Sequence, residues 1–168
     1  AGAVLTGAVL AGLSGFFKMK WGPAELISSF LISAAVGFVV NYFITGPLDD
    51  PANNLLASYA IGKQYFLAWL YPPSKLNSGA AIAVLAAAAV YFLMSRTHVG
   101  YEMRMCGLNR EFARYGGINV RAYLVAPMGL SGALHGLGGA LAVLGTHGAA
   151  IKGFAGGMGW NGIAVALI

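Results

Sequence analysis

Four long apolar runs constrain the fold of this chain more than any other feature of its sequence. Small, aliphatic and aromatic side chains dominate residues 1–17, 24–45, 79–95 and 122–144. A helix needs about 17–25 apolar residues to cross a bilayer, and in lipid it satisfies its own backbone polar groups. The four runs therefore predict membrane-spanning α-helices. The apolar residues 161–168 predict a fifth span that the end of the sequence cuts short.

The residue composition excludes a water-soluble domain. Only 9% of the residues are charged and 58% are hydrophobic, whereas soluble proteins carry about 25% charged residues. The chain also has 25 glycines, and small residues allow membrane helices to approach one another closely. We therefore expect an all-α, polytopic transmembrane bundle in which residues 1–168 form part of a longer domain. The single Cys106 excludes an internal disulfide.

The distribution of positive charge predicts the orientation of the spans. Lys18 and Lys20 follow the first run, and the loop 96–121 carries five arginines against two glutamates. The stretch 46–78 instead balances two lysines with two aspartates. Because Lys and Arg concentrate in cytoplasmic loops, we expect the loop 96–121 in the cytoplasm and the stretch 46–78 outside a bacterial inner membrane. The net charge of +5 then reflects orientation in the membrane and not the binding of a nucleic acid polymer.

Part of the external stretch is rich in aromatic side chains. Residues 61–71 read IGKQYFLAWLY and are too few to span a bilayer. Amphipathic rings are favoured at the membrane interface, so we expect a short helix there. A hairpin that enters the mouth of a pore is the alternative.

No motif for covalent catalysis, metal binding or nucleotide binding is found in the sequence. His98, His135 and His147 lack the spacing of metal ligands. The glycine-rich residues 153–159 are not followed by the Lys-Ser/Thr pair of a phosphate-binding loop. We therefore expect no catalytic residue, no metal and no cofactor. Energy for active transport would have to come from another subunit.

The loop 96–121 contains the signals of a short helix. Asn109 is a suitable N-cap for residues 110–115, and Gly116 and Gly117 are a suitable stop. Such a helix would present charged and aromatic side chains to a cytoplasmic partner. An ordinary basic loop held near anionic lipid headgroups explains the same residues equally well.

This loop resembles the cytoplasmic coupling loop of ABC importer permeases of the branched-chain amino acid, ribose and nucleoside group. In the nucleoside or "simple sugar" branch the loop is similar to G-x-E-x-R-x-x-G-x-N-x-x-A-A-R-Y-x-G-I. The matching residues are Gly100, Glu102, Arg104, Gly107, Asn109, Ala113, Arg114, Tyr115, Gly117 and Ile118. Residues 157–167 are also close to the branch pattern G-x-G-x-D-G-I-A-V-A-L, with Asn161 in place of the usual Asp.

The resemblance implies a bundle like that of type II ABC importers and a permease subunit that is not itself an enzyme. It implies a cytoplasmic ABC ATPase, a second permease subunit and an extracytoplasmic solute-binding protein as partners, with membrane lipid around the bundle. A nucleoside is the expected solute, with a sugar or a branched-chain amino acid as alternatives. The residues implied to couple to the ATPase are Asn109, Arg110, Glu111, Phe112, Ala113, Arg114, Tyr115 and Gly116.

Two other classes of protein fit the apolar runs. A passive solute channel would form its pore from the glycine-rich helices and would need no docking helix at residues 109–116. A structural membrane subunit would use the same glycines only to hold a complex together.

Polar residues within the spans are candidates for a solute pathway. They are Ser29, Ser33, Asn41, Ser131, His135 and Asn161. The alternative is a structural role, in which serines bond their own helix backbone and Ser131 satisfies a neutral His135. Ser33, His135 and Asn161 also depart from the residues of the similar branch, which leaves the identity of the solute open.

Four glycines of the run 122–144 follow a three-four-three spacing. They are Gly129, Gly132, Gly136 and Gly139. This spacing predicts a smooth helix face that packs closely against a neighbouring helix.

Overall fold

The computed structural model describes residues 1–22, 25–49, 56–68, 77–153, 156, 161–162, 165 and 168, excluding the side chains of Glu25, Leu26 and Lys63. Its elements are α1 (Gly2–Trp21), α2 (Glu25–Thr45), the 3₁₀ turn η1 (Lys63–Tyr65), α3 (Ser78–Arg96), α4 (His98–Leu108), α5 (Arg110–Tyr115), α6 (Val120–Ala142) and the π-helical turn η2 (Val143–His147). Isolated bridges pair Asp49 with Ser58 and Ala57 with Ile151. The predicted all-α class is confirmed.

Four of the described helices are long and apolar enough to cross a membrane. They cover Gly2–Trp21, Ile27–Thr45, Ser78–Arg96 and Val120–His147. Large apolar side chains are exposed along them, as Phe38 and Val84 are at 77% and 69%. Such surfaces suit lipid or further helices and not water. The chain is therefore a multi-pass membrane protein.

Two sequence expectations lie partly outside the described residues. Half of the expected fifth span, 161–168, and most of the glycine-rich residues 153–159 are not described. The aromatic segment 61–71 is described as far as residue 68, and there it forms only the single 3₁₀ turn η1.

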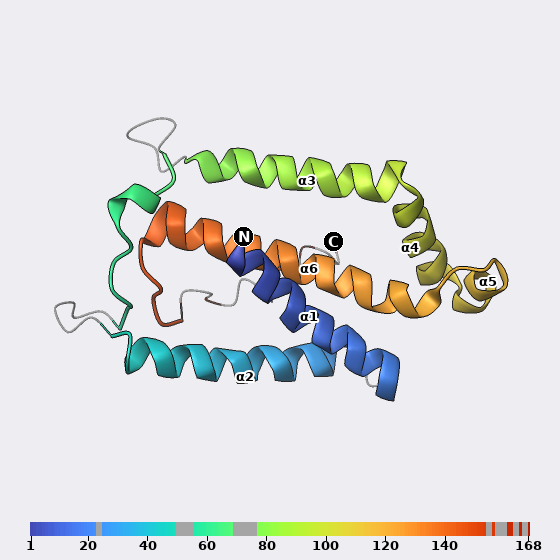
Figure 1. Cartoon of the computed structure of the whole chain (residues 1–168), viewed down its shortest axis with the longest axis horizontal. Helices are drawn as coiled ribbons and strands as arrows, with labels where there is room; N and C mark the ends of the chain where they lie inside the picture. The colour runs from blue at the N-terminus through green and yellow to red at the C-terminus, as the bar shows by residue number, and fades with distance from the viewer. Residues whose placement is uncertain are drawn as a thin grey trace.

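The α1–α6 pair is the most closely packed part of the bundle (Figure 1). A β-carbon built on Gly132 would collide with the carbonyl oxygen of Gly7 and with the side chain of Ala11. A β-carbon on Gly136 would collide with the carbonyl oxygen of Ala3. Only glycine at these positions allows the two backbones to approach this closely.

α2 packs on α1 through a buried polar contact. The hydroxyl oxygens of Ser14 and Ser28 lie 3.2 Å apart and form a hydrogen bond. Both side chains are buried, Ser14 at 1% exposure and Ser28 at 8%. Hydrogen bonds between membrane helices contribute about 0.6 kcal/mol on average, so this pair orients α2 more than it stabilises the bundle.

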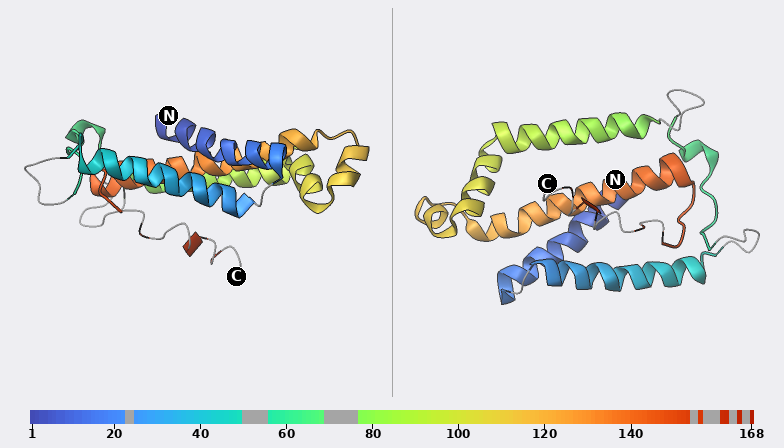
Figure 2. Two further views of the ribbon diagram at one scale, coloured as in Figure 1. Left: turned by 90° about the horizontal axis from the view of Figure 1, so that it is seen from below. Right: turned by 180° about the vertical axis from the view of Figure 1, so that it is seen from behind.

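α2 and α3 lie on either side of α6, as the views from the front and from behind both show (Figures 1 and 2). At one end of the bundle α4 and α5 connect α3 to α6. At the other end the segment 56–68 pairs with the residues that follow α6, through Ile61 N donating to Gly148 O at 2.8 Å. Asn77 closes this second end, since its Nδ2 donates to Gly145 O at 2.9 Å and its Oδ1 accepts from Gly79 N at 3.0 Å.

Candidate coupling site

The chain turns sharply where α3 ends and α4 begins. The Thr97 hydroxyl donates to the carbonyl oxygen of Leu93 at 2.6 Å and accepts from Gly100 N at 3.2 Å. Gly100 is buried in the turn, and a β-carbon there would lie 2.6 Å from Cα of Met94. The turn therefore requires glycine at position 100. Residues 96–108, expected as part of a loop, instead form α4 over most of their length, because Thr97 caps a new helix directly after α3.

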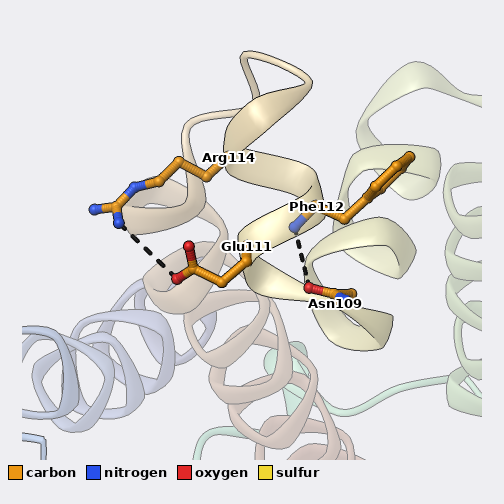
Figure 3. A network of polar contacts seen from close by, with 4 residues as sticks. All are labelled: Asn109, Glu111, Phe112 and Arg114. Carbon is orange, nitrogen blue, oxygen red and sulfur yellow. Dashed lines mark hydrogen bonds and ion pairs between the residues drawn. The ribbon is translucent and has the colours of Figure 1, made fainter.

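α5 begins and ends through local interactions. Asn109 is the N-cap, and its Oδ1 accepts from Phe112 N at 3.0 Å (Figure 3). Gly116 N donates to Phe112 O at 3.0 Å, and Gly117 has a φ of +80°. That left-handed conformation is favourable for glycine and ends the helix. α5 thus has the bounds that the sequence predicts for it.

One residue of α5 faces inward and most of the others face outward. Ala113 is 1% exposed, whereas Phe112 is 61% and Tyr115 is 89% exposed. Beside the two rings, Glu111 and Arg114 form an exposed ion pair with 4.0 Å between Oε1 and a guanidinium nitrogen. Exposed pairs of this kind contribute little to stability. α5 therefore presents two aromatic rings and paired charges on a small helix that Ala113 anchors.

The helices on both sides of α5 are tied to each other. Tyr123 of α6 lies near the Glu102 carboxylate of α4. Cys106 lies buried in α4, and burial together with the charge of Glu102 raises the pKa of its thiol. Asn119 caps α6 by accepting from Ala122 N at 3.4 Å. A displacement of α5 would therefore be transmitted to the end of α4 and to the start of α6.

The candidate pathway residues are placed on two helices, α2 and α6, that both pack on α1 (Figure 1). On α2, Ser33 is exposed, while Ser29 and Asn41 are half-buried. On α6, Nδ1 of the exposed His135 donates to the carbonyl oxygen of Ser131 at 2.8 Å. The histidine thus bonds the backbone of residue 131 and not its hydroxyl. The structure does not bring the two sets together, and Asn161 is exposed.

The four glycines of α6 differ in what they face. Gly132 and Gly136 contact the backbone of α1, and a β-carbon on Gly129 would lie 3.7 Å from the carbonyl oxygen of Ala8. A β-carbon on Gly139 would have nothing within 4 Å. Three of the positions therefore lie on the α1 side of the helix, and the fourth lies in open space.

Sequence analysis did not identify several residues that shape the bundle. Thr97 and Asn77 each precede a helix and carry the usual N-cap signal, so local inspection could have found them. The buried pair of Ser14 and Ser28 gives no comparable local signal, because it depends on which helices meet.

Comparison with known proteins places the chain in one family. A family model described as "Branched-chain amino acid transport system / permease component" matches residues 1–168. The chain is 38% identical over 166 residues to the "Probable riboflavin import permease protein RfuC" of Treponema pallidum, covering 99% of this chain and 44% of that protein. It is 34% identical over 173 residues to the "Guanosine ABC transporter permease protein NupP" of Bacillus subtilis, covering 99% and 50%.

A third relative is named for a sugar. The chain is 29% identical over 176 residues to the "Glucose ABC transporter permease protein TsgB13" of Haloferax volcanii, covering 99% of this chain and 46% of that protein. The chain thus spans about half the length of these curated relatives. No solved structure matches it.

Proposed function

Because the chain belongs to the family of branched-chain amino acid transport system permease components, we propose that it is part of the permease subunit of an ATP-driven ABC importer. In this proposal α5 docks on a separate cytoplasmic ATPase, and the bundle moves a nucleoside or a similar small polar solute across the bacterial inner membrane. The chain contributes no covalent chemistry. Its role is to convert movement of the ATPase into movement of the spans.

The exposure pattern of α5 is the observation that carries the proposal. Phe112 and Tyr115 expose large aromatic surfaces, whereas Ala113 between them is buried. Exposed aromatic and arginine side chains are the groups most often found at the centre of protein interfaces. A passive channel has no need of such a surface outside the membrane. The docking residues are therefore Arg110, Glu111, Phe112, Arg114 and Tyr115, with Asn109, Ala113 and Gly116 holding the helix in place.

The charge pattern supports a cytoplasmic position for α5. Lys18 at the end of α1 and Arg110 at the start of α5 are near enough for their positive charges to interact. Both basic connections thus meet at one end of the bundle, as the positive-inside rule requires of a cytoplasmic side. The opposite end, with residues 56–68, would receive solute from an extracytoplasmic binding protein. A second permease subunit would complete the pathway, because the polar residues of α2 and α6 do not enclose one here.

Chemistry and relatives support an uncharged solute with several hydroxyl groups. The four candidate spans carry few charged residues, and a buried charge in a solute would need a partner. Guanosine and riboflavin, named for two relatives, both join a nitrogen heterocycle to a polyhydroxylated carbon chain or ring. We place a nucleoside first and a sugar second, since a third relative is named for glucose. A branched-chain amino acid is third.

Site-specific photo-crosslinking in native membranes tests the proposal. A photoreactive amino acid replaces Tyr115 in the full-length protein, and the captured protein is identified with and without a non-hydrolysable ATP analogue. The control carries the same group at Phe38, which is 77% exposed in the middle of α2. We expect an ATP-binding subunit to be captured from position 115 only, in an amount that changes with nucleotide.

The opposite result would favour the channel. If position 115 captured only lipid or the permease itself while solute still crossed the membrane without ATP, the docking role of α5 would be rejected. Uptake of labelled guanosine in competition with glucose and leucine then identifies the solute class independently of the crosslinking result.

A further inference from the structure

A long groove runs between α3 and α6. Its first part has a volume of about 630 Å³ and is bounded by α3, α4 and α6. A second part, of about 520 Å³, continues between α3 and α6 and shares Val90 and Leu134 with the first. Along the helices the walls are almost entirely apolar. They include Met94, Met128, Leu130 and Leu134 in the first part.

The lining of the groove changes from apolar to positively charged at its α4–α5 end. Two arginines, Arg104 and Arg110, line it there, and the Glu102 carboxylate near Cys106 and Tyr123 is not itself among the lining residues. Lys18 adds a third positive charge that interacts unfavourably with Arg110. An anion at this point would therefore relieve repulsion between cations that already lie close together.

The dimensions of the first part match one leaflet of a membrane. From Leu124 near the arginines to Leu134 is ten residues of helix, or about 15 Å at 1.5 Å per residue. The hydrocarbon core of a bilayer is about 30 Å thick, so one leaflet also measures about 15 Å. The groove thus offers cations at the depth of the headgroups and apolar walls down to the midplane.

We propose that the first part of the α3–α6 groove binds an anionic phospholipid of the cytoplasmic leaflet, with its phosphate on Arg104 and Arg110 and an acyl chain along Met94, Met128 and Leu134. Basic pockets between membrane helices on the cytoplasmic side are suited to anionic headgroups. The proposal goes beyond transport and does not require an ATPase to dock on α5. It does tie the lipid to the coupling site, because Arg110 belongs to both.

A protein helix matches the chemistry of this groove less well. It would have to bring its own carboxylate to the two arginines at the depth of the headgroups, whereas an anionic phospholipid carries its phosphate there.

Native mass spectrometry of the purified full-length protein tests lipid binding. The protein is reconstituted into nanodiscs that contain equal amounts of phosphatidylglycerol and phosphatidylcholine, released into detergent, and the retained lipids are identified. We expect the wild type to retain phosphatidylglycerol in excess. Each arginine near an anionic surface favours binding about fivefold, so Arg104→Gln should lower the preference about fivefold and the double variant R104Q/R110Q about 25-fold.

Two controls separate the groove from general charge and general packing. Arg121→Gln removes one positive charge from the same end of the bundle but lies outside the groove, and it should leave the preference unchanged. Leu134→Trp should fill the groove and reduce retention of either lipid, whereas Val84→Trp, at an exposed site on α3 outside the groove, should not. Size-exclusion chromatography of each variant checks that it remains folded.

Photo-crosslinking from position 94 gives the occupant directly. An adduct with the mass of phosphatidylglycerol supports the proposal. An adduct with a peptide from another helix overturns it. Equal loss of preference in R121Q and R104Q overturns it as well, and so does retention of glycerol phosphate alone with the affinity of the intact lipid, since the site would then hold a small anion. None of these outcomes depends on capture of an ATPase from α5.

Discussion

Gly7 and Gly132 face each other so closely that the carbonyl oxygen of each occupies the place where a β-carbon of the other would lie. This reciprocal contact joins α1 to α6, and α6 begins only five residues after α5 ends. α2 is in turn joined to α1 by the hydroxyls of Ser14 and Ser28. A displacement of α6 by α5 would therefore be transmitted through packed contacts to α1 and α2. It would reach α3 separately, through α4.

Replacement of Gly132 by alanine should destabilise the protein, whereas replacement of Gly139 should not. Alanine at position 132 meets the backbone of α1, and overpacking of this kind costs about 1–3 kcal/mol. At position 139 nothing lies within 4 Å, so alanine should be neutral or stabilise the helix by up to about 1 kcal/mol. Thermal unfolding of the two variants in the same detergent measures the difference. Equal midpoints would contradict the observed helix face.

A double-mutant cycle on Ser14 and Ser28 should give a small coupling energy. Each Ser→Ala change removes the hydrogen bond that joins the two buried hydroxyls, so the losses of the two single variants should add up to more than the loss of the double variant. The expected coupling is about 0.6 kcal/mol. Ser33→Ala serves as a control because Ser33 is exposed on the same helix. Strictly additive losses would show that the two hydroxyls do not interact in the membrane.

The features that local sequence can predict are those whose causes are local. Apolar length predicts the long helices, and Asn109 with Gly116 and Gly117 predicts the bounds of α5, because caps and stops act within a few residues. The pairing of Ser14 with Ser28 could not be predicted, because it depends on the rotation of two helices about their axes. The glycine spacing of α6 predicts a packing face but could not tell Gly132 from Gly139. That distinction follows from where α1 crosses.

The charged composition of residues 96–108 is the reason why helix α4 was not predicted from the sequence. Arg96, His98, Glu102 and Arg104 are typical of a loop between spans, and the cap by Thr97 was the only local indication of a helix. The groove between α3 and α6 was also beyond prediction, since its arginines come from α4 and α5 and its walls from two spans. Residues that are distant in sequence meet there only because α4 turns sharply at Gly100.

Loss of the Asn109 cap should unfold α5 locally. Asn109→Ala removes the side chain that accepts from Phe112 N, and such changes cost about 1 kcal/mol. A helix of one and a half turns has little else to hold it. Hydrogen exchange should therefore accelerate at residues 112–116 without change in α6. Asn109→Ser keeps a capping oxygen and should restore protection; failure of serine to do so would assign the effect to another role of the asparagine.

Enlargement of Ala113 should lower the stability of the protein, whereas truncation of Tyr115 should weaken only the association with the proposed ATPase. Ala113 is 1% exposed, so Ala113→Leu would overpack the underside of α5 at a cost of about 1–3 kcal/mol. Tyr115 is 89% exposed, so Tyr115→Ala should leave the unfolding midpoint unchanged and weaken only the association with the ATPase. Co-purification of the ATPase and thermal unfolding, measured on both variants, separate the two effects. A lower midpoint for Tyr115→Ala would indicate that the ring packs within the permease.

Reaction of Cys106 with a maleimide should be slow and shifted to high pH. Burial and the neighbouring Glu102 carboxylate raise the pKa of this thiol, and only the thiolate reacts. At neutral pH the thiolate fraction is therefore smaller than that of an exposed cysteine, and the rate should rise at higher pH than for a free thiol near about 8.5. The folded state keeps the proton that the unfolded state releases, so this group should make the protein less stable as pH rises above that value.

Cys106 is the only cysteine in this sequence, which makes the labelling of the isolated chain unambiguous. The control is Leu108→Cys in a Cys106→Ala background, because residue 108 is 82% exposed at the end of α4. Equal rates and equal pH profiles for the two thiols would contradict the packing of α4 against α6.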